Sequence, residues 1–169
     1  KKSPLFFSDY NMKRIEFIKM VASGNDFVII QQCQLSSTSY PCLAGRRELS
    51  ALAKKICDRK FGIGADGLLL LQESKKADIR MRIFNADGSQ AEMCGNGARC
   101  VALWASAKRK AQSAKLKIET KAGIIQAEIN KDNVKIKLTD PRDLKEVSLR
   151  IDGRKYKVYF INTGVPHVV

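Results

Sequence analysis

The stretch RIFNADGSQAEMCGNGARCVALW, residues 82–104, places Cys94 at the start of an apolar helix. The first turn of a helix presents unpartnered backbone N–H groups and a partial positive charge, so it can hold a carboxylate and favour a thiolate. Gly95 and Gly97 flank Asn96, and we expect them to let a ligand approach the backbone and to adopt torsions that other residues avoid. A cysteine alone is more often buried and structural. The surrounding motif instead favours a reactive thiol beside a bound anion.

The spacing of apolar residues predicts an α+β fold with many short strands and few helices. We expect helices over 46–57 and 96–109. We expect strands over 14–20, 26–31, 67–73, 79–84, 115–120, 123–130, 133–138, 146–150 and 155–162. The 169 residues suit one domain, which we place at 12–169. Residues 1–11 lack a clear period and precede Met12, so they are interpreted as an extension or an expression remnant.

The formal charge of +14 raises the question of a nucleic-acid partner. The lysines of 115–121 and 135–138 alternate with apolar residues, a pattern typical of strands with one solvated face. Aromatic residues for base stacking are not interleaved with them. We therefore predict no nucleic-acid partner, and keep a basic binding module without catalysis as the alternative from a different class. No apolar run approaches the roughly 20 residues of a membrane span, so we also predict no membrane partner.

The cysteines and the single histidine argue against a metal site. The five cysteines form an odd set without a C-x-x-C pair, and no secretory leader is recognised, so we expect reduced thiols and a cytoplasmic location. His167 is the only histidine, whereas a structural zinc site needs four well-spaced ligands. We predict no metal.

Three further features are ambiguous when taken one at a time. The segment 61–67, FGIGADG, matches G-x-G-x-x-G, but a helix is expected before it and a strand after it, so a structural turn is favoured over nucleotide binding. Asn25 and Asn85 lie in turns, where asparagine usually bonds its own backbone. His167 lies at a junction between a strand and a loop, where a structural role is the more common one.

Together, five segments resemble the diaminopimelate epimerase family in the same order and with similar spacing. They are KMVASGNDF (19–27), CDRKFGIGADG (57–67), RIFNADGS (82–89), CGNGAR (94–99) and GVPH (164–167). The resemblance covers residues 12–169, which correspond to the amino-terminal half of the family's usual length. It implies two similar halves, each a barrel-like sheet of mixed or antiparallel strands around a central helix, with the active site in the cleft between them.

The resemblance also implies a reaction without a cofactor. Two cysteines, a thiolate and a thiol, would invert the α-carbon and interconvert LL- and meso-diaminopimelate for lysine and peptidoglycan precursor synthesis. Cys94 matches the first cysteine, and the second lies in a later segment that this chain does not contain. The expected partners are the substrate, the missing carboxy-terminal half and, as one option, a second copy in a homodimer. A related amino-acid racemase or isomerase of the same fold is the alternative enzyme.

By the same resemblance, His167 tunes the cysteine pair. Gly95 and Asn96 would donate backbone N–H groups to the α-carboxylate, while Asn25 and Asn85 would contact the distal end of the substrate. This chain departs from the family pattern at Val165, where many members carry Asn, and at Gly67, where some members carry an amide side chain.

Overall fold

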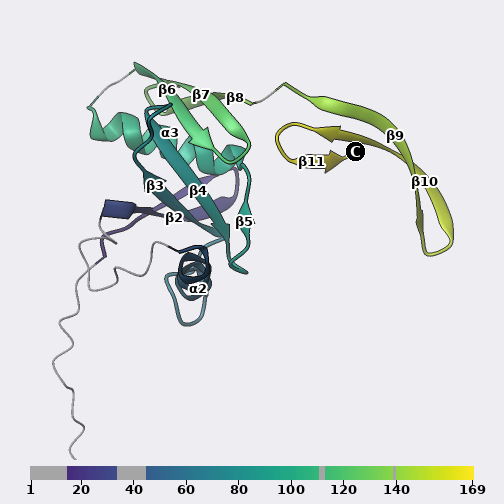
Figure 1. Ribbon diagram of the computed structural model, residues 1–169, viewed down its shortest axis with the longest axis horizontal. Coiled ribbons are helices and arrows are strands. Elements are labelled where there is room, and N and C mark those ends of the chain that lie inside the picture. The colour runs from purple at the N-terminus through teal and green to yellow at the C-terminus, as the bar shows by residue number, and fades with distance from the viewer. Residues whose placement is uncertain (1–14, 34–44, 111–112, 139) are drawn as a thin grey trace, which may run out of the picture.

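The computed structural model describes residues 15–33, 45–110, 113–138 and 140–169. Within these residues the strands form two sheets, which we call the large sheet and the small sheet (Figure 1). The large sheet has the order β1-β2-β3-β4-β6-β7-β8, with β5 paired to β4, and the small sheet has the order β11-β10-β9. The large-sheet strands are β1 (Ile18–Ala22), β2 (Asn25–Gln31), β3 (Gly67–Gln72), β4 (Ile79–Asn85), β5 (Gln90–Ala91), β6 (Ser113–Thr120), β7 (Gly123–Asn130) and β8 (Asn133–Lys137). The small-sheet strands are β9 (Arg142–Ile151), β10 (Arg154–Asn162) and β11 (Pro166–Val168).

The large sheet is mixed and curls around helix α3 (Gly95–Lys108). Its β2–β3 and β4–β6 pairs are parallel, and its other pairs are antiparallel. Helix α3 contacts the sheet from β1 at one edge to β8 at the other (Figure 1). The predicted α+β class, with a barrel-like half around a central helix, is confirmed.

Strand β3 explains how the large sheet holds a helix on each side. Successive strand residues point to opposite faces, and Leu68–Leu71 are all buried. Leu69 and Leu71 belong to the core under α3, whereas Leu68 and Leu70 belong to the core under α2 (Arg46–Cys57). Burying each leucine stabilises the fold by roughly 1.5–3 kcal/mol. A strand that is apolar on both faces is therefore the centre of this region.

The first hairpin is tighter than the sequence predicts. Strand β1 ends at Ala22, which pairs with Asn25, so only Ser23 and Gly24 form the turn. Both have positive φ, 49° and 86°, as the two central residues of a type I′ hairpin require. The expected strand over 14–20 is thus shifted to 18–22, and Asn25 becomes the first residue of β2.

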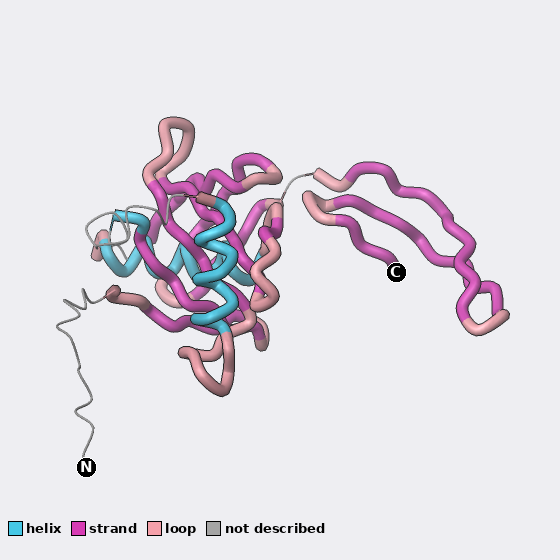
Figure 2. The backbone as a smooth tube through the Cα atoms, turned by 60° about the horizontal axis from the view of Figure 1, so that its bottom comes forward, coloured by secondary structure: helices cyan, strands magenta, loops and turns pink. Residues whose placement is uncertain are grey.

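The small sheet is amphipathic but has no cover within the described residues. Pairs such as Tyr156↔Leu149 and Val158↔Val147 put apolar side chains on one side, while Lys157↔Ser148 faces the other. We call the first side the apolar face; it comprises Val147, Leu149, Ile151, Tyr156, Val158 and Phe160. Figure 2 shows this sheet extending away from the large sheet. The predicted strand over 146–150 extends to 142–151, and β5 and β11 were not predicted. The predicted extension at residues 1–11 lies outside the described residues.

Candidate active site

Cys94 is the N-cap of α3. Its backbone is extended, with φ −145° and ψ 117°, and its Sγ accepts a hydrogen bond from the Gly97 N–H at 3.4 Å. The carbonyl of Cys94 accepts the first helical bond, from the Ala98 N–H at 2.9 Å. The thiol is half-buried at the position where the helix presents its unpartnered N–H groups. An anionic ligand at this end of α3 would therefore lie beside the sulfur atom.

The glycines around Asn96 act through space, not through unusual torsions. Neither Gly95 nor Gly97 is among the residues with positive φ, so the torsional part of our interpretation was wrong: both lie in regular helix. A Cβ at Gly97 would lie 3.1 Å from Leu69 Cδ2, so the leucine side chain would have to shift by a few tenths of an ångström. Gly97 thus lets α3 start tightly against β3. Gly95 has more room, since the nearest side-chain atom to its virtual Cβ is 3.7 Å away, on Arg99.

Sheet register brings Asn25 and Asn85 to the same end of the large sheet. Gly67, the first residue of β3, pairs with Asn85 at the end of β4 and with Phe27 near the start of β2. Asn25 precedes Phe27 by two residues on that strand. The Asn85 Nδ2 donates to Ser89 Oγ at 2.9 Å, so this side chain bonds within its own turn. Both asparagines are exposed.

A side-chain hydrogen bond joins the sheet end to the helix start. The Asn96 Nδ2 donates to Asn25 Oδ1 at 2.8 Å, across 71 residues of sequence. The Asn96 Oδ1 accepts from Arg99 Nη1 at 3.1 Å. Of the predicted residues, Cys94, Gly95, Asn96 and Asn25 are therefore gathered in one place.

Next to this place lies an ion network that the sequence-based predictions did not include. Arg59 bridges Asp26 and Asp66, and Lys19 also pairs with Asp26 at 3.1 Å. The hydrogen bond from Arg59 is the main cause that lowers the pKa of Asp26. Asp66 Oδ2 accepts from the Asn25 Nδ2 at 3.3 Å. The sequence signal for this network was that Asp26 and Asp66 lie in glycine-containing motifs and that Arg59 precedes Asp66 by seven residues.

His167 lies in β11, opposite Ile161, and is exposed. Within the described residues, no hydrogen bond or ion pair connects it to the residues around Cys94. Its role with the cysteine pair stays a prediction.

Two other cysteines are buried thiols. Burial raises the pKa of Cys57 to about 11, and burial with a smaller contribution from Cys94 raises the pKa of Cys100 to about 11. Cys33 is exposed but remote from the helix start, and Cys42 lies outside the described residues. The thiol at position 94 is thus distinguished by its place at the start of α3.

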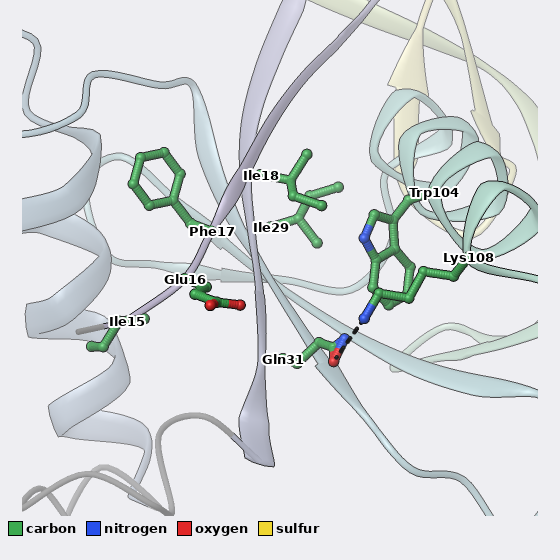
Figure 3. A pocket seen from close by; sticks show the side chains of 8 residues that line it. All are labelled: Ile15, Glu16, Phe17, Ile18, Ile29, Gln31, Trp104 and Lys108. Atoms are coloured by element: carbon green, nitrogen blue, oxygen red, sulfur yellow. Dashed lines mark hydrogen bonds between the residues drawn. The ribbon is translucent and has the colours of Figure 1, made fainter. Parts of the chain in front are cut away.

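A cavity of about 440 Å³ lies away from this site, at the other end of α3 (Figure 3). It is lined by Ile15, Phe17, Ile18, Ile29 and Trp104, with Lys108 Nζ donating to Gln31 Oε1 at 3.4 Å on one side. The lining is mostly apolar, with Glu16, Gln31 and Lys108 as its polar residues. We do not assign the chemistry to it.

Other features of the described residues bear on the remaining predictions. The glycine motif at 61–67 follows α2 and ends at Gly67, the first residue of β3, so a helix precedes it and a strand follows it, as the sequence indicates. Among these residues, no helix is long and apolar enough to cross a membrane. The same residues include no group of three or more His, Cys, Asp or Glu side chains that could hold a metal ion.

Comparison with solved structures defines the class of fold. The chain superposes on a hydroxyproline epimerase from Agrobacterium vitis with a TM-score of 0.67, covering 93% of this chain and 51% of that one, at 13% identity. At this identity the likeness concerns the fold alone. The chain thus has the fold of an amino-acid epimerase, as represented by this hydroxyproline epimerase.

Sequence comparison gives the family. The diaminopimelate epimerase family profile matches residues 17–143, and the chain belongs to that family. The diaminopimelate epimerase of Archaeoglobus fulgidus is 40% identical over 168 residues, covering 92% of this chain and 58% of that protein. The enzyme of Carboxydothermus hydrogenoformans is 41% identical, covering 92% and 59%. The chain thus spans somewhat more than half the length of these relatives. Strands β9–β11 lie almost wholly beyond the residues that the family profile matches.

Proposed function

We propose that this chain is the amino-terminal part of an enzyme that interconverts LL- and meso-diaminopimelate without a cofactor. The observation that carries the proposal is the placement of Cys94 at the start of α3, with Asn96 and Asn25 beside it, in a chain of this family. The reaction belongs to lysine and peptidoglycan precursor synthesis, in the cytoplasm.

The chemistry follows from the geometry of the helix start. The backbone N–H groups of Gly95 and Asn96 hold the substrate α-carboxylate, which sets the α-carbon beside Cys94. The Cys94 sulfur exchanges a proton on one face of that carbon: as a thiolate it removes the proton, and as a thiol it donates one in the reverse direction. Asn25 and Asn85 contact the distal end of the substrate from the sheet end.

The opposite face of the α-carbon needs a second acid or base, which we assign to a cysteine in a carboxy-terminal half. Two observations support a further half. The chain spans 58% of the Archaeoglobus fulgidus enzyme, and the apolar face of the small sheet is uncovered within the described residues. In this arrangement His167 reaches the cysteine pair from the small sheet, and residues 12–169 serve as the amino-terminal domain.

Deuterium incorporation at the α-carbon in heavy water, followed by chiral separation, tests the proposal. We expect the 169-residue chain alone to give no stereoinversion, because Cys94 reaches only one face of the carbon. Adding the separately expressed carboxy-terminal half should restore the reaction, and Cys94→Ser should then abolish it. Cys33→Ser, which changes an exposed thiol away from the site, is the matched control and should leave activity unchanged.

Two outcomes would contradict this function. Stereoinversion by the purified chain alone would require another acid within it. Turnover of proline or hydroxyproline, with none of diaminopimelate, would assign the chain to a related amino-acid racemase of the same fold.

A further inference from the structure

Arg59 joins two carboxylates next to the candidate site. Its Nη2 lies 2.8 Å from Asp26 Oδ1 and 2.8 Å from Asp66 Oδ1, and its Nη1 lies 3.2 Å from Asp26 Oδ2. Arg59 comes from the loop after α2, and Gly64 in that loop has φ +75°. A Cβ at Gly64 would lie 3.2 Å from the Arg59 Cα, so the loop turns back closely on itself. Lys19 Nζ also donates to the Gly64 carbonyl at 2.6 Å, which ties the loop to β1.

The second oxygen of Asp66 points at the active-site amides. Asp66 Oδ2 accepts from the Asp26 N–H at 3.0 Å and from the Asn25 Nδ2 at 3.3 Å. A carboxylate only accepts hydrogen bonds, so the nitrogen end of the Asn25 amide must face it. The oxygen end then faces α3, where it accepts from the Asn96 Nδ2 at 2.8 Å. The contact with Asp66 thus favours the orientation of the Asn25 amide in which its oxygen faces Asn96.

We propose that Asp66 is a positioning residue that acts through Asn25 on Asn96, and thereby on the first turn of α3. The relay runs from the loop after α2, held by Arg59, to the residue that follows Gly95 in the carboxylate cradle. Its importance for turnover rests on the proposed function, but the coupling between Asp66 and Asn96 does not. The polar contacts of the Asp66 carboxylate are with Arg59, the Asp26 N–H and Asn25.

The simpler role for Asp66 would be to hold the loop after α2 against β2. Asp78 offers a matched control that separates this structural role from the positioning of Asn25. Asp78 Oδ1 pairs with Arg109 Nη2 at 3.4 Å, and its Oδ2 accepts from the Lys117 N–H at 2.8 Å. Its side chain is 36% exposed, against 39% for Asp66. Asp78 therefore has the same kinds of partner, an arginine and a backbone N–H, without a contact to a site asparagine.

Side-chain amide NMR signals of the ¹⁵N-labelled chain test the coupling directly. We expect Asp66→Asn to shift the NH₂ signals of both Asn25 and Asn96, because an amide in place of the carboxylate presents a donor to donors. Asp78→Asn should shift neither. In an Asn25→Ala background, Asp66→Asn should no longer shift Asn96. Arg59→Gln keeps Asp66 in place and should shift the same two signals less, which preserves the test if Asp66→Asn does not fold.

Unchanged Asn96 signals in Asp66→Asn, or equal shifts from both aspartate variants, would overturn the proposal. So would an Asn96 shift that persists without the Asn25 side chain. In the full-length enzyme, Asp66→Asn should lower kcat/KM on the order of tenfold while Asp78→Asn leaves it unchanged. Intact coupling with no turnover of diaminopimelate would refute the proposed function alone, whereas normal kcat/KM without coupling would refute the relay alone.

Discussion

Strand β7 of the large sheet and strand β9 of the small sheet both alternate apolar and polar residues, but within the described residues only the large sheet has a core. In the large sheet, Ile118 of β6 and Ile125 of β7 are a cross-strand pair in the core under α3, and they are 0% and 1% exposed. In the small sheet, Leu149 and Tyr156 are paired in the same way, yet they remain 38% and 45% exposed. The difference lies in what packs on the face. Alternation determines which side of a strand is apolar, and stability comes only when another element covers that side.

The largest expected difference between the two sheets concerns a leucine in each. Leu116 in β6 is 2% exposed, so Leu116→Ala should lower the free energy of unfolding by about 2–5 kcal/mol through lost burial and a cavity. Leu149→Ala should lower it by about 0.5 kcal/mol or less. Urea denaturation followed by circular dichroism measures both, with Lys117→Ala as a surface control in β6. Equal losses would mean that the small sheet is covered in solution.

Thiol reactivity gives a second contrast between the two regions. A pKa of about 11 for Cys57 and Cys100, against an ordinary 9.0, lowers their thiolate fraction about a hundredfold at neutral pH. Brief treatment with iodoacetamide should therefore label Cys94 before either of them, and should label Leu149→Cys on the apolar face on the order of a hundredfold faster than Cys100. Peptide mapping measures the rates.

The pH dependence of labelling checks the cause. Because both shifts are upward, reaction of Cys57 and Cys100 should keep rising to about pH 11, whereas an ordinary thiol levels off above about pH 9. Preferential labelling of Cys57 or Cys100 at neutral pH would contradict the assignment of Cys94.

The smallest expected difference is electrostatic. The pKa of Asp26 is lowered in the folded chain, so its carboxylate stabilises the fold above the ordinary value of 3.8, and this contribution is lost as the pH falls below it. Asp26→Asn should cost about 1 kcal/mol at pH 7 and flatten the loss of stability below pH 4. Glu146→Gln, which removes an exposed pair with Lys157 in the small sheet, should cost about 0.5 kcal/mol or less. Thermal unfolding between pH 2 and pH 7 compares them, and identical pH profiles would refute the special position of Asp26.

Much of the fold could be predicted from periodicity. The predicted bounds of α2, β7 and β8 agree with the structure to within a residue, because their apolar residues recur with a regular period and turn residues flank the two strands. Strands β5 and β11 are two and three residues long, too short to show an alternation, and only their partners define them.

The candidate site was predictable only in part. Cys94 and the start of α3 form a local signal, because the helix N-cap and its glycines are adjacent in sequence. The contact between Asn25 and Asn96 spans 71 residues, and the Arg59–Asp26 pair spans 33, so both depend on sheet order and loop path. The torsions expected for Gly95 and Gly97 were wrong for a related reason: packing against Leu69 gives Gly97 its role, and that contact is not visible in sequence.

The apolar face of the small sheet, which no described residue covers, also affects how the chain self-associates in solution. Behind that face, the opposite side of the small sheet carries Arg150, Lys155 and Lys157, and the whole chain has a formal charge of +14. At low ionic strength, repulsion between these charges keeps two apolar faces from meeting. Salt shortens the range of that repulsion to about 10 Å at 0.1 M. Self-association of the chain therefore increases with salt, opposite in sign to the salt dependence of binding a polyanion.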